Sequence, residues 1–342
     1  MIVDALSAVY GAAATWRREW YAQRPARARR LTQPVISVGN LRVGGTGKTP
    51  AVACIARLLV ESGERPVILS RGYARQKPSG AVTIVSTREA VIADVAHAGD
   101  EPLLLARMLP GVPVLVCADR FKAGQRGEAE LNATVHLLDD GFQHVRLARD
   151  IDLLMADEQD LDDRVLPAGR LREPLANASG AHALIVPGAG PDTARKVAER
   201  LGIREVFRTT RALGTPVMLQ PAGAAFDVSL PVFAIAGIAR PHRFFDDARA
   251  AGLHLMGTLA FRDHHPFDRA DVARMLSSAR GCGAQAIITT EKDAMRLQGL
   301  DLSSMPFAAV PLLTRIEPAD TFAAWLAGRL AHVRAAGGRE RS

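Results

Sequence analysis

Short apolar runs alternate with segments of helical periodicity from Pro34 to about Pro187, and this alternation predicts an α/β domain. Several of the runs are apolar at every position, as expected for strands that are buried on both faces of a mostly parallel sheet. The expected strands are 35–38, 67–70, 82–85, 114–117, 134–138, 151–155 and 183–186.

A second α/β series begins at Val232, after the stretch 204–230, which lacks the strand–helix alternation of the first series. Within that stretch, runs 206–213 and 217–220 flank Gly214-Thr215-Pro216 and predict a two-stranded connection. The second series predicts helices near 241–251 and 268–279, strands near 253–259, 286–289 and 307–310, and a closing helix from 318 to about 333. We therefore expect an N-terminal segment at 1–33, a first domain at 34–203, a linker at 204–230, a smaller domain at 231–334 and a frayed tail at 335–342.

The first residues form an apolar stripe at helical spacing, followed by a cluster of arginines. The stripe comprises Ile2, Leu6, Val9, Ala13, Trp16 and Trp20. Its longest uncharged run, 5–16, is too short to span a bilayer, and the charge follows the apolar part instead of preceding it as in a secretory signal. We expect a helix lying in a membrane interface; the alternative is a helix docked on the protein's own core, and different faces could serve both roles.

The composition and net charge of the chain indicate which classes of binding partner to expect. The chain has 342 residues, 48% of them hydrophobic, and a net charge of +7, which predicts a globular protein with two domains and an anionic partner. Zinc-finger spacing, an RNP-like aromatic motif and a lysine-rich tail are all missing from the sequence, so we expect no nucleic-acid partner. The cysteines Cys54, Cys117 and Cys282 are far apart and show no metal spacing, which fits a reducing cytosol.

Gly44-Gly45-Thr46-Gly47-Lys48-Thr49 lies between a predicted strand and a predicted helix, the order that a phosphate-binding P-loop needs. Glycines let successive backbone N–H groups point at one anion, the lysine reaches the β- and γ-phosphates, and the threonine hydroxyl binds Mg²⁺. The pattern departs from the strict motif at Arg42, where a glycine is usual, and from the K-G-G-x-G-K-[ST] variant at Val43. The residues expected to hold the nucleotide are Arg42, Val43, Gly44, Gly45, Thr46, Gly47, Lys48 and Thr49.

Acidic residues follow or precede other predicted elements. Asp139-Asp140-Gly141 begins at the end of a strand, where an acid is well placed to hold Mg²⁺ together with Thr49. Asp100 opens a predicted helix at 103–108, and its roles as N-cap, metal-shell residue or general base stay open.

Basic and histidine side chains supply further candidates. His264 and His265 follow Asp263 in a predicted loop and suit acid–base or phosphate-contact chemistry. Arg120 and Arg172 follow predicted strands, where a guanidinium suits a phosphate or carboxylate. The segment 290–293 has the wrong spacing for the guanine-reading N-K-x-D motif, which weakens a GTPase interpretation.

Taken together, these segments resemble the tetraacyldisaccharide 4′-kinase family of lipid A biosynthesis over nearly the whole chain. The resemblance is carried, in the family's order, by segments 37–40 with 44–50, 70–73, 99–102, 139–144, 171–174, 263–265 and 290–294. It implies a P-loop NTPase-like α/β fold with a mostly parallel sheet, a second, smaller α/β domain, a two-stranded linker and a membrane-associated N-terminal helix. It also implies transfer of the ATP γ-phosphate to the 4′-hydroxyl of a tetraacyldisaccharide 1-phosphate.

The resemblance further implies ATP and Mg²⁺ as cofactors, Asp100 as the base working with His264, and Mg²⁺ held by Thr49 and an acid of the Asp139–Asp140 pair. Arg120, Arg172 and Glu173 are the expected substrate-binding residues. The protein is then expected to act peripherally at the cytoplasmic face of the bacterial inner membrane, on an anionic surface, with no obligate protein partner. The alternatives are a P-loop GTPase or ligase-like enzyme acting on a soluble metabolite, and an ATP-dependent adaptor at the membrane surface.

Overall fold

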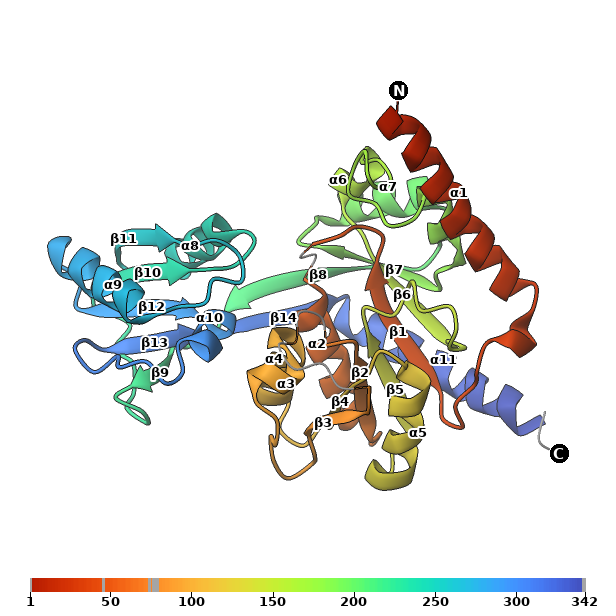
Figure 1. The fold of residues 1–342 in the computed structure, drawn as a ribbon, viewed down its shortest axis with the longest axis horizontal. Helices are drawn as coiled ribbons and strands as arrows, with labels where there is room; N and C mark the ends of the chain where they lie inside the picture. Colours follow the sequence, from red (N-terminus) through yellow and green to blue (C-terminus); the bar gives the residue numbers. More distant parts are fainter. Residues whose placement is uncertain (1, 45–46, 73–74, 76–79, 340–342) are drawn as a thin grey trace. The chain divides into compact units, whose positions relative to one another are not determined.

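The computed structural model describes residues 2–44, 47–72, 75 and 80–339, and the chain divides into two compact units (Figure 1). The first unit contains the residues up to Thr210 together with those from Arg315 onward, and the second contains Arg211–Thr314. Among the described residues, no helix combines the length and apolar character that a membrane crossing requires.

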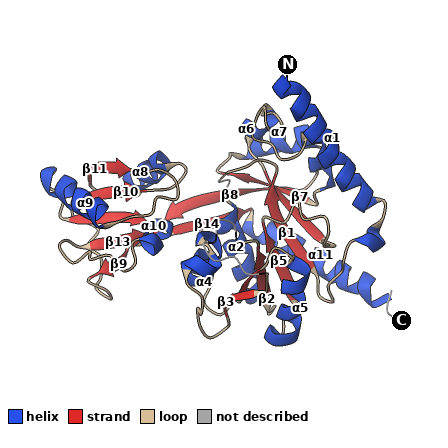
Figure 2. Ribbon diagram, in the orientation of Figure 1, coloured by secondary structure: helices blue, strands red, loops and turns tan. Residues whose placement is uncertain are grey.

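The first unit is built on a nine-stranded sheet in the order β14-β8-β7-β6-β1-β5-β2-β4-β3 (Figure 2). Neighbours from β8 to β4 run parallel, and β3 is antiparallel to β4. The strands are β1 Val35–Asn40, β2 Pro66–Ser70, β3 Thr83–Ser86, β4 Val114–Val116, β5 Val135–Asp139, β6 Ile151–Met155, β7 Ala183–Pro187, β8 Val206–Leu213 and β14 Leu312–Glu317. The predicted mostly parallel sheet is confirmed.

Helices pack on this sheet because each carries an apolar stripe. Ala123 of α5 joins a core cluster with Val67 and Leu69, and Val197 of α7 joins one with Leu184 and Val186. The helices are α1 Ile2–Ala22, α2 Lys48–Glu61, α3 Val95–Ala98, α4 Asp100–Met108, α5 Arg120–Leu131, α6 Glu158–Leu161, α7 Pro191–Leu201 and α11 Ala319–Arg339, with 3₁₀ turns η1 Pro25–Arg27 and η2 Leu175–Gly180.

The sheet order decides where the functional residues meet. Strand β1 lies between β5 and β6, and Val38 of β1 is paired with Asp139 of β5. The carboxyl ends of these parallel strands therefore open at one edge, where ligands of open α/β sheets bind. Both β1 and β5 are buried at every position, including the polar residues Asn40 and Asp139 at their carboxyl ends.

Helix α1 packs through small residues and exposes its large apolar ones. Ser7 and Gly11 are buried, and the space at Gly11 is closed by Pro174, whose Cγ would lie 3.3 Å from an added Cβ. Ile2, Leu6, Val9 and Trp16 of the predicted stripe are exposed, Leu6 by 54% and Trp16 by 65%. The docked face and the apolar stripe are thus different faces of one helix.

The second unit contains a five-stranded sheet in the order β11-β10-β12-β13-β9. Alternation along β10 directs Val232 and Ala234 into a cluster with α8, and Phe233 and Ile235 into a cluster with α9, so these helices cover opposite faces. The elements are β9 Val217–Gln220, β10 Val232–Ala236, α8 Pro241–Ala250, β11 Leu255–Ala260, α9 Arg269–Gly281, β12 Ala286–Thr290, α10 Glu291–Arg296 and β13 Phe307–Val310.

Both strands predicted for the linker are present, as β8 Val206–Leu213 and β9 Val217–Gln220. Strands β8 and β9 belong to different sheets: β8 lies between β7 and β14, and β9 pairs antiparallel with β13. The boundaries between the units fall within β8 and β14, which are neighbours in the first sheet, so these are the two strands that connect the units.

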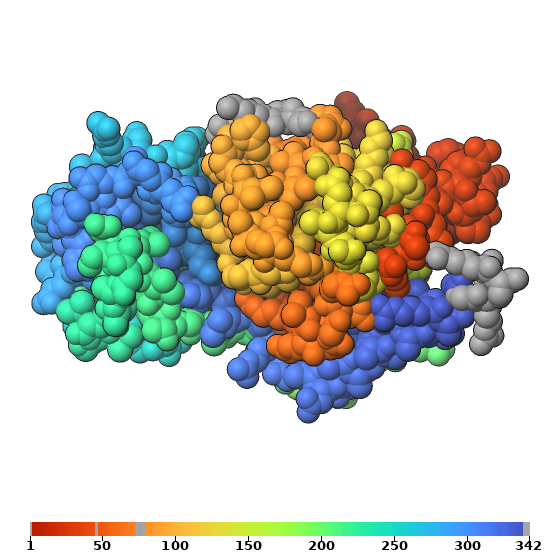
Figure 3. Space-filling view, turned by 90° about the horizontal axis from the view of Figure 1, so that it is seen from below, coloured from red at the N-terminus to blue at the C-terminus, as the bar shows by residue number. Residues whose placement is uncertain are grey.

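The smaller domain ends earlier than the predicted residue 334, because the chain returns to the first unit at Arg315. Phe322 of α11 stacks edge-on against Phe207 of β8, with ring centroids 4.9 Å apart. Arg334 pairs with Glu64 just beyond α2, where Figure 3 shows the blue α11 lying against the orange segment. The helix runs to Arg339, so residues 335–339 are helical and not a frayed tail, although Gly337 and Gly338 are poor helix formers. Residues 340–342 of the predicted tail lie outside the described residues.

Candidate active site

The phosphate-loop prediction falls at the end of β1. Strand β1 ends at Asn40, and α2 begins at Lys48 after Gly47, whose left-handed φ of 82° suits glycine. Lys48 Nζ donates to Asn40 Oδ1 over 2.9 Å and lies 3.5 Å from Asp140 Oδ1. Thr49 follows in the first turn of α2. Gly45 and Thr46 lie outside the described residues.

The Arg42 side chain points away from the phosphate loop and pairs with two aspartates near α6. Its side chain is 2% exposed and forms ion pairs with Asp157 at 2.8 Å and Asp160 at 3.1 Å. The Val43 N–H donates to the Arg170 carbonyl over 2.8 Å, while the Val43 side chain and Gly44 are exposed. Arg42 therefore anchors the entry to the loop, and a direct contact between its guanidinium and nucleotide stays a prediction.

The two adjacent aspartates have opposite environments. Asp139 is 6% exposed and accepts a hydrogen bond of 3.2 Å from the Ser70 hydroxyl. Burial and the neighbouring charge of Asp140 raise its pKa to about 6. Although burial opposes ionisation of Asp140, hydrogen bonding to Arg172 and the charge of Lys48 lower the pKa of Asp140 to about 2. One carboxylate is thus firmly ionised, and the other is easily protonated.

The structure brings Arg172 into this group. Its Nη1 and Nη2 each donate to Asp140 over 2.9 Å, and Nη2 also donates to Asn40 Oδ1. Asn40 thereby receives hydrogen bonds from both Lys48 and Arg172. Because Gln143 Nε2 donates to the Asn40 carbonyl over 2.9 Å, the segment after Asp140 is fastened to β1 as well.

Arg120 is the first residue of α5 and is 4% exposed. Burial lowers its pKa to about 10, against the opposing influence of the Asp139 carboxylate. Its Nη1 donates to the Ala118 carbonyl, and its Nε has no hydrogen-bond partner among the described residues. A buried guanidinium near Asp139 can bind an anion, and its contact with substrate stays a prediction.

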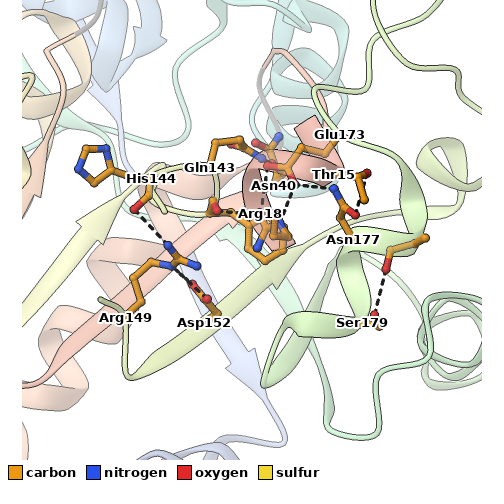
Figure 4. Close-up of polar contacts among 12 residues, drawn as sticks. Thr15, Arg18, Asn40, Gln143, His144, Arg149, Asp152, Glu173, Asn177 and Ser179 are labelled. Atoms are coloured by element: carbon orange, nitrogen blue, oxygen red, sulfur yellow. Dashed lines mark hydrogen bonds and ion pairs between the residues drawn. The ribbon is translucent and has the colours of Figure 1, made fainter. Parts of the chain in front are cut away.

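Glu173 is 5% exposed and is held inside the first unit. It accepts hydrogen bonds from Arg18 at 2.8 and 3.1 Å and from Asn177 Nδ2 at 3.0 Å (Figure 4). Its carboxylate oxygens are occupied by these partners, and its predicted contact with the substrate is not tested by this arrangement.

Asp100 is the first helical residue of α4, and the N-cap position belongs to Gly99, which has a φ of 86°. Of the three roles left open by the sequence, N-cap is therefore wrong, because glycine alone readily adopts that backbone conformation. The metal-shell and general-base roles remain as predictions for this half-buried side chain.

His264 lies in the second unit, in the loop after β11, with a left-handed φ of 58°. Arg296 Nη2 lies 3.1 Å from its Nδ1, and Lys292 Nζ lies 3.4 Å from its Nε2. Arginine and lysine side chains only donate, so each ring nitrogen of His264 faces a cationic donor. His265 instead pairs with Asp271 at 2.7 Å. Since Asp100 and His264 belong to different units, their joint action stays a prediction.

Sequence reasoning missed Arg296 and Lys292 as partners of the histidine. Asp293 is buried, accepts from the Gly237 N–H over 2.9 Å, and pairs with Arg296 at 3.1 Å. The segment 290–293, which resembled a misplaced guanine-reading motif, is thus the start of α10, with Thr290 as its N-cap. The four-residue spacing of Lys292 and Arg296 was a usable signal, because it places both on one helical face.

A lysine at the start of the helix after β1, beside paired carboxylates at the end of the neighbouring parallel strand, defines a P-loop NTPase-like phosphotransferase. The chain belongs to the tetraacyldisaccharide-1-P 4'-kinase family, whose model matches residues 1–331.

Individual relatives agree over nearly their full lengths. A tetraacyldisaccharide 4'-kinase from Geobacter metallireducens is 38% identical, with 93% of this chain and 94% of that protein covered. One from Pelobacter propionicus is 40% identical, with 91% and 86% covered. Among solved structures, LpxK from Aquifex aeolicus in complex with ATP is 32% identical with a TM-score of 0.77, covering 96% of this chain and 100% of that one.

Proposed function

We propose that this protein transfers the γ-phosphate of ATP to the 4′-hydroxyl of a tetraacyldisaccharide 1-phosphate, a lipid A precursor. Membership of the kinase family supports the reaction, and the ATP complex of the Aquifex aeolicus relative supports the donor. The observation that carries the proposal is the convergence of Lys48 and Arg172 on Asn40 and Asp140 at the end of β1. This arrangement joins a phosphate-binding cation to a carboxylate pair suited to Mg²⁺.

The loop at 42–49 binds the triphosphate through its backbone N–H groups and through Lys48, aided by the amino-terminal end of α2. Thr49 and an acid of the Asp139–Asp140 pair hold Mg²⁺, which, when bound, neutralises charge on the β- and γ-phosphates. Among the described residues, no three His, Cys, Asp or Glu side chains cluster as a metal site. That finding fits Mg²⁺, which takes one or two carboxylates and completes its shell with phosphate and water oxygens.

Proton removal from the acceptor hydroxyl falls to Asp100, acting with His264. A histidine imidazole can donate a hydrogen bond to a carboxylate or accept one from the reacting hydroxyl. Arg120 and Arg172 neutralise the lipid phosphate or the transferred group, and Glu173 supports substrate binding from the adjacent position.

The protein works as a peripheral enzyme on the cytoplasmic face of the bacterial inner membrane. Support comes from the exposed apolar residues of α1, and from the arginines that follow the stripe. An amphipathic helix of this kind lies in the interface of an anionic bilayer with its apolar side buried among acyl chains.

The test is to incubate the protein with γ-labelled ATP, Mg²⁺ and a tetraacyldisaccharide 1-phosphate in detergent, and to separate lipid from free phosphate. Label is expected in the lipid, and an acceptor whose 4′-hydroxyl is replaced by hydrogen should take up none. Label released only as free phosphate, at the same rate with and without lipid, would contradict the proposal and favour an ATP-dependent adaptor.

A further inference from the structure

Arg18 of α1 is largely buried, unlike the apolar stripe of the same helix. Its side chain is 16% exposed and pairs with Glu173, with the Nε–Oε2 distance at 2.8 Å. Its Nη2 also donates to the Phe142 carbonyl over 2.9 Å, and its guanidinium carbon lies 4.1 Å from the centroid of the Phe142 ring. Figure 4 shows Arg18 at the centre of this group of polar contacts.

The two segments that Arg18 joins are the two that form the candidate active site. Phe142 comes two residues after Asp140, and Glu173 comes directly after Arg172. Arg172 and Asp140 are themselves joined by two hydrogen bonds of 2.9 Å. Two arginines therefore link the same two segments: Arg172 links them within the site, and Arg18 links them from α1.

Phe142 packs directly against the backbone of β1 at Gly39. It is fully buried, and an added Cβ on Gly39 would lie only 2.5 Å from the Phe142 Cβ and 2.7 Å from its nitrogen. The backbone of β1 and the segment after Asp140 are therefore in close contact next to Asn40, which accepts from Lys48. A shift of Phe142 would move the groups around Lys48 as well.

We propose that Arg18 is a positioning residue for phosphoryl transfer, which couples the seating of α1 to the Asp140–Arg172 pair. The inference rests on the proposed function. Helix α1 exposes Leu6 and Trp16 to a bilayer, and through Arg18 it also holds the segments that carry Asp140 and Arg172. Displacement of α1 would remove the Arg18 contacts and loosen both segments. Small misplacements of catalytic groups lower the rate of the chemical step.

The test compares Arg18→Ala with Arg17→Ala, which removes the same charge from an exposed position on the same helix. We measure kcat and KM for ATP and for lipid in detergent, together with sedimentation on anionic liposomes. Arg18→Ala should lower kcat about 10- to 100-fold with little change in either KM. Arg17→Ala should retain wild-type kcat, and the two variants should lose liposome binding equally.

Two further variants separate positioning from folding. Arg18→Lys keeps the charge but not the planar fork, so it should restore only part of kcat. Arg18→Met keeps the apolar stem over Phe142 and should remain folded while showing the low kcat, which covers the case in which Arg18→Ala does not fold. Arg18→Ala and Glu173→Ala should be non-additive, because they remove the same ion pair.

An effect of Arg18→Ala or Arg18→Met confined to KM, or equal to that of Arg17→Ala, would overturn the positioning role. These outcomes require a wild-type protein that labels the lipid. A wild type that labels no lipid contradicts the proposed function instead. The same variants are then compared by their rates of ATP hydrolysis, which should again be about 10- to 100-fold lower for Arg18→Ala than for Arg17→Ala.

Discussion

Arg172 holds Asp140 by two hydrogen bonds of 2.9 Å, one from each terminal guanidinium nitrogen. The pair spans 32 residues of sequence and joins the end of β5 to the segment before η2. It keeps Asp140 ionised and fixes its carboxylate beside Lys48. The site is therefore organised around Asp140, whose pKa is lowered, and its neighbour Asp139, whose pKa is raised.

Lys48→Ala should abolish phosphoryl transfer and leave the fold intact. Lys48 neutralises charge on the β- and γ-oxygens, a contribution worth several kcal/mol in the transition state. The measurement is the rate of lipid labelling, together with thermal unfolding and far-ultraviolet circular dichroism. Lys196→Ala removes an exposed lysine from α7 and serves as the control. Near-wild-type turnover by folded Lys48→Ala would show that the phosphate-loop assignment is wrong.

Asp139→Asn should change how stability depends on pH. The folded pKa of Asp139 is raised from 3.8 to about 6, so its contribution is fully present below pH 3.8 and is lost as the pH rises through 6. A difference of about two pKa units corresponds to about 3 kcal/mol. In metal-free buffer, the free energy of unfolding of Asp139→Asn relative to wild type should rise by about this amount between pH 4 and pH 7.

Urea unfolding of both proteins at one-unit intervals of pH measures that difference, in which groups common to both proteins cancel. A difference that stays constant between pH 4 and pH 7 would mean that Asp139 titrates normally in the folded protein.

Replacing Trp16 and Trp20 with serine should reduce sedimentation with anionic liposomes, and high salt should reduce it further by screening the arginines. Because Trp16 is 65% exposed and Trp20 is half-buried, the melting temperature should change little. Val228→Ser removes an exposed apolar side chain from the second unit and is the matched control. Unchanged liposome binding would argue that the apolar stripe does not contact the membrane.

Asp100→Ala and His264→Ala should each lower kcat by roughly 10²–10⁴-fold, within the range of general base catalysis. If the two residues act as one unit, the double variant should be little worse than the more damaged single variant. Steady-state kinetics with lipid and ATP varied separately would test this. Multiplicative losses, or an effect of His264→Ala on KM alone, would show that the histidine binds substrate and is not part of a dyad.

The candidate chemistry could be predicted because its signals are local. The apolar run, Gly44 and Lys48 lie within a few residues of one another, and the Asp139–Asp140 pair stands directly at the end of its own apolar run. Strand burial and glycine-rich turns depend on neighbouring residues, so periodicity and motif spacing were sufficient. Resemblance to the family added the substrate and the roles of Asp100 and His264, which no local pattern supplies.

The sequence by itself determined the two α/β series, the phosphate loop and the amphipathic character of α1. Only the tertiary structure decided that β8 is next to β14, that α11 returns to the first unit, and that Arg42 and Glu173 are held by internal ion pairs. Arg18 and Glu173 are 155 residues apart, and Arg42 and Asp157 are 115 apart. Every ionised acid in the sequence carries the same charge, so the sequence does not say which carboxylate a given guanidinium will contact. That choice depends on the packing of the chain, which brings two residues so far apart in sequence within reach of each other.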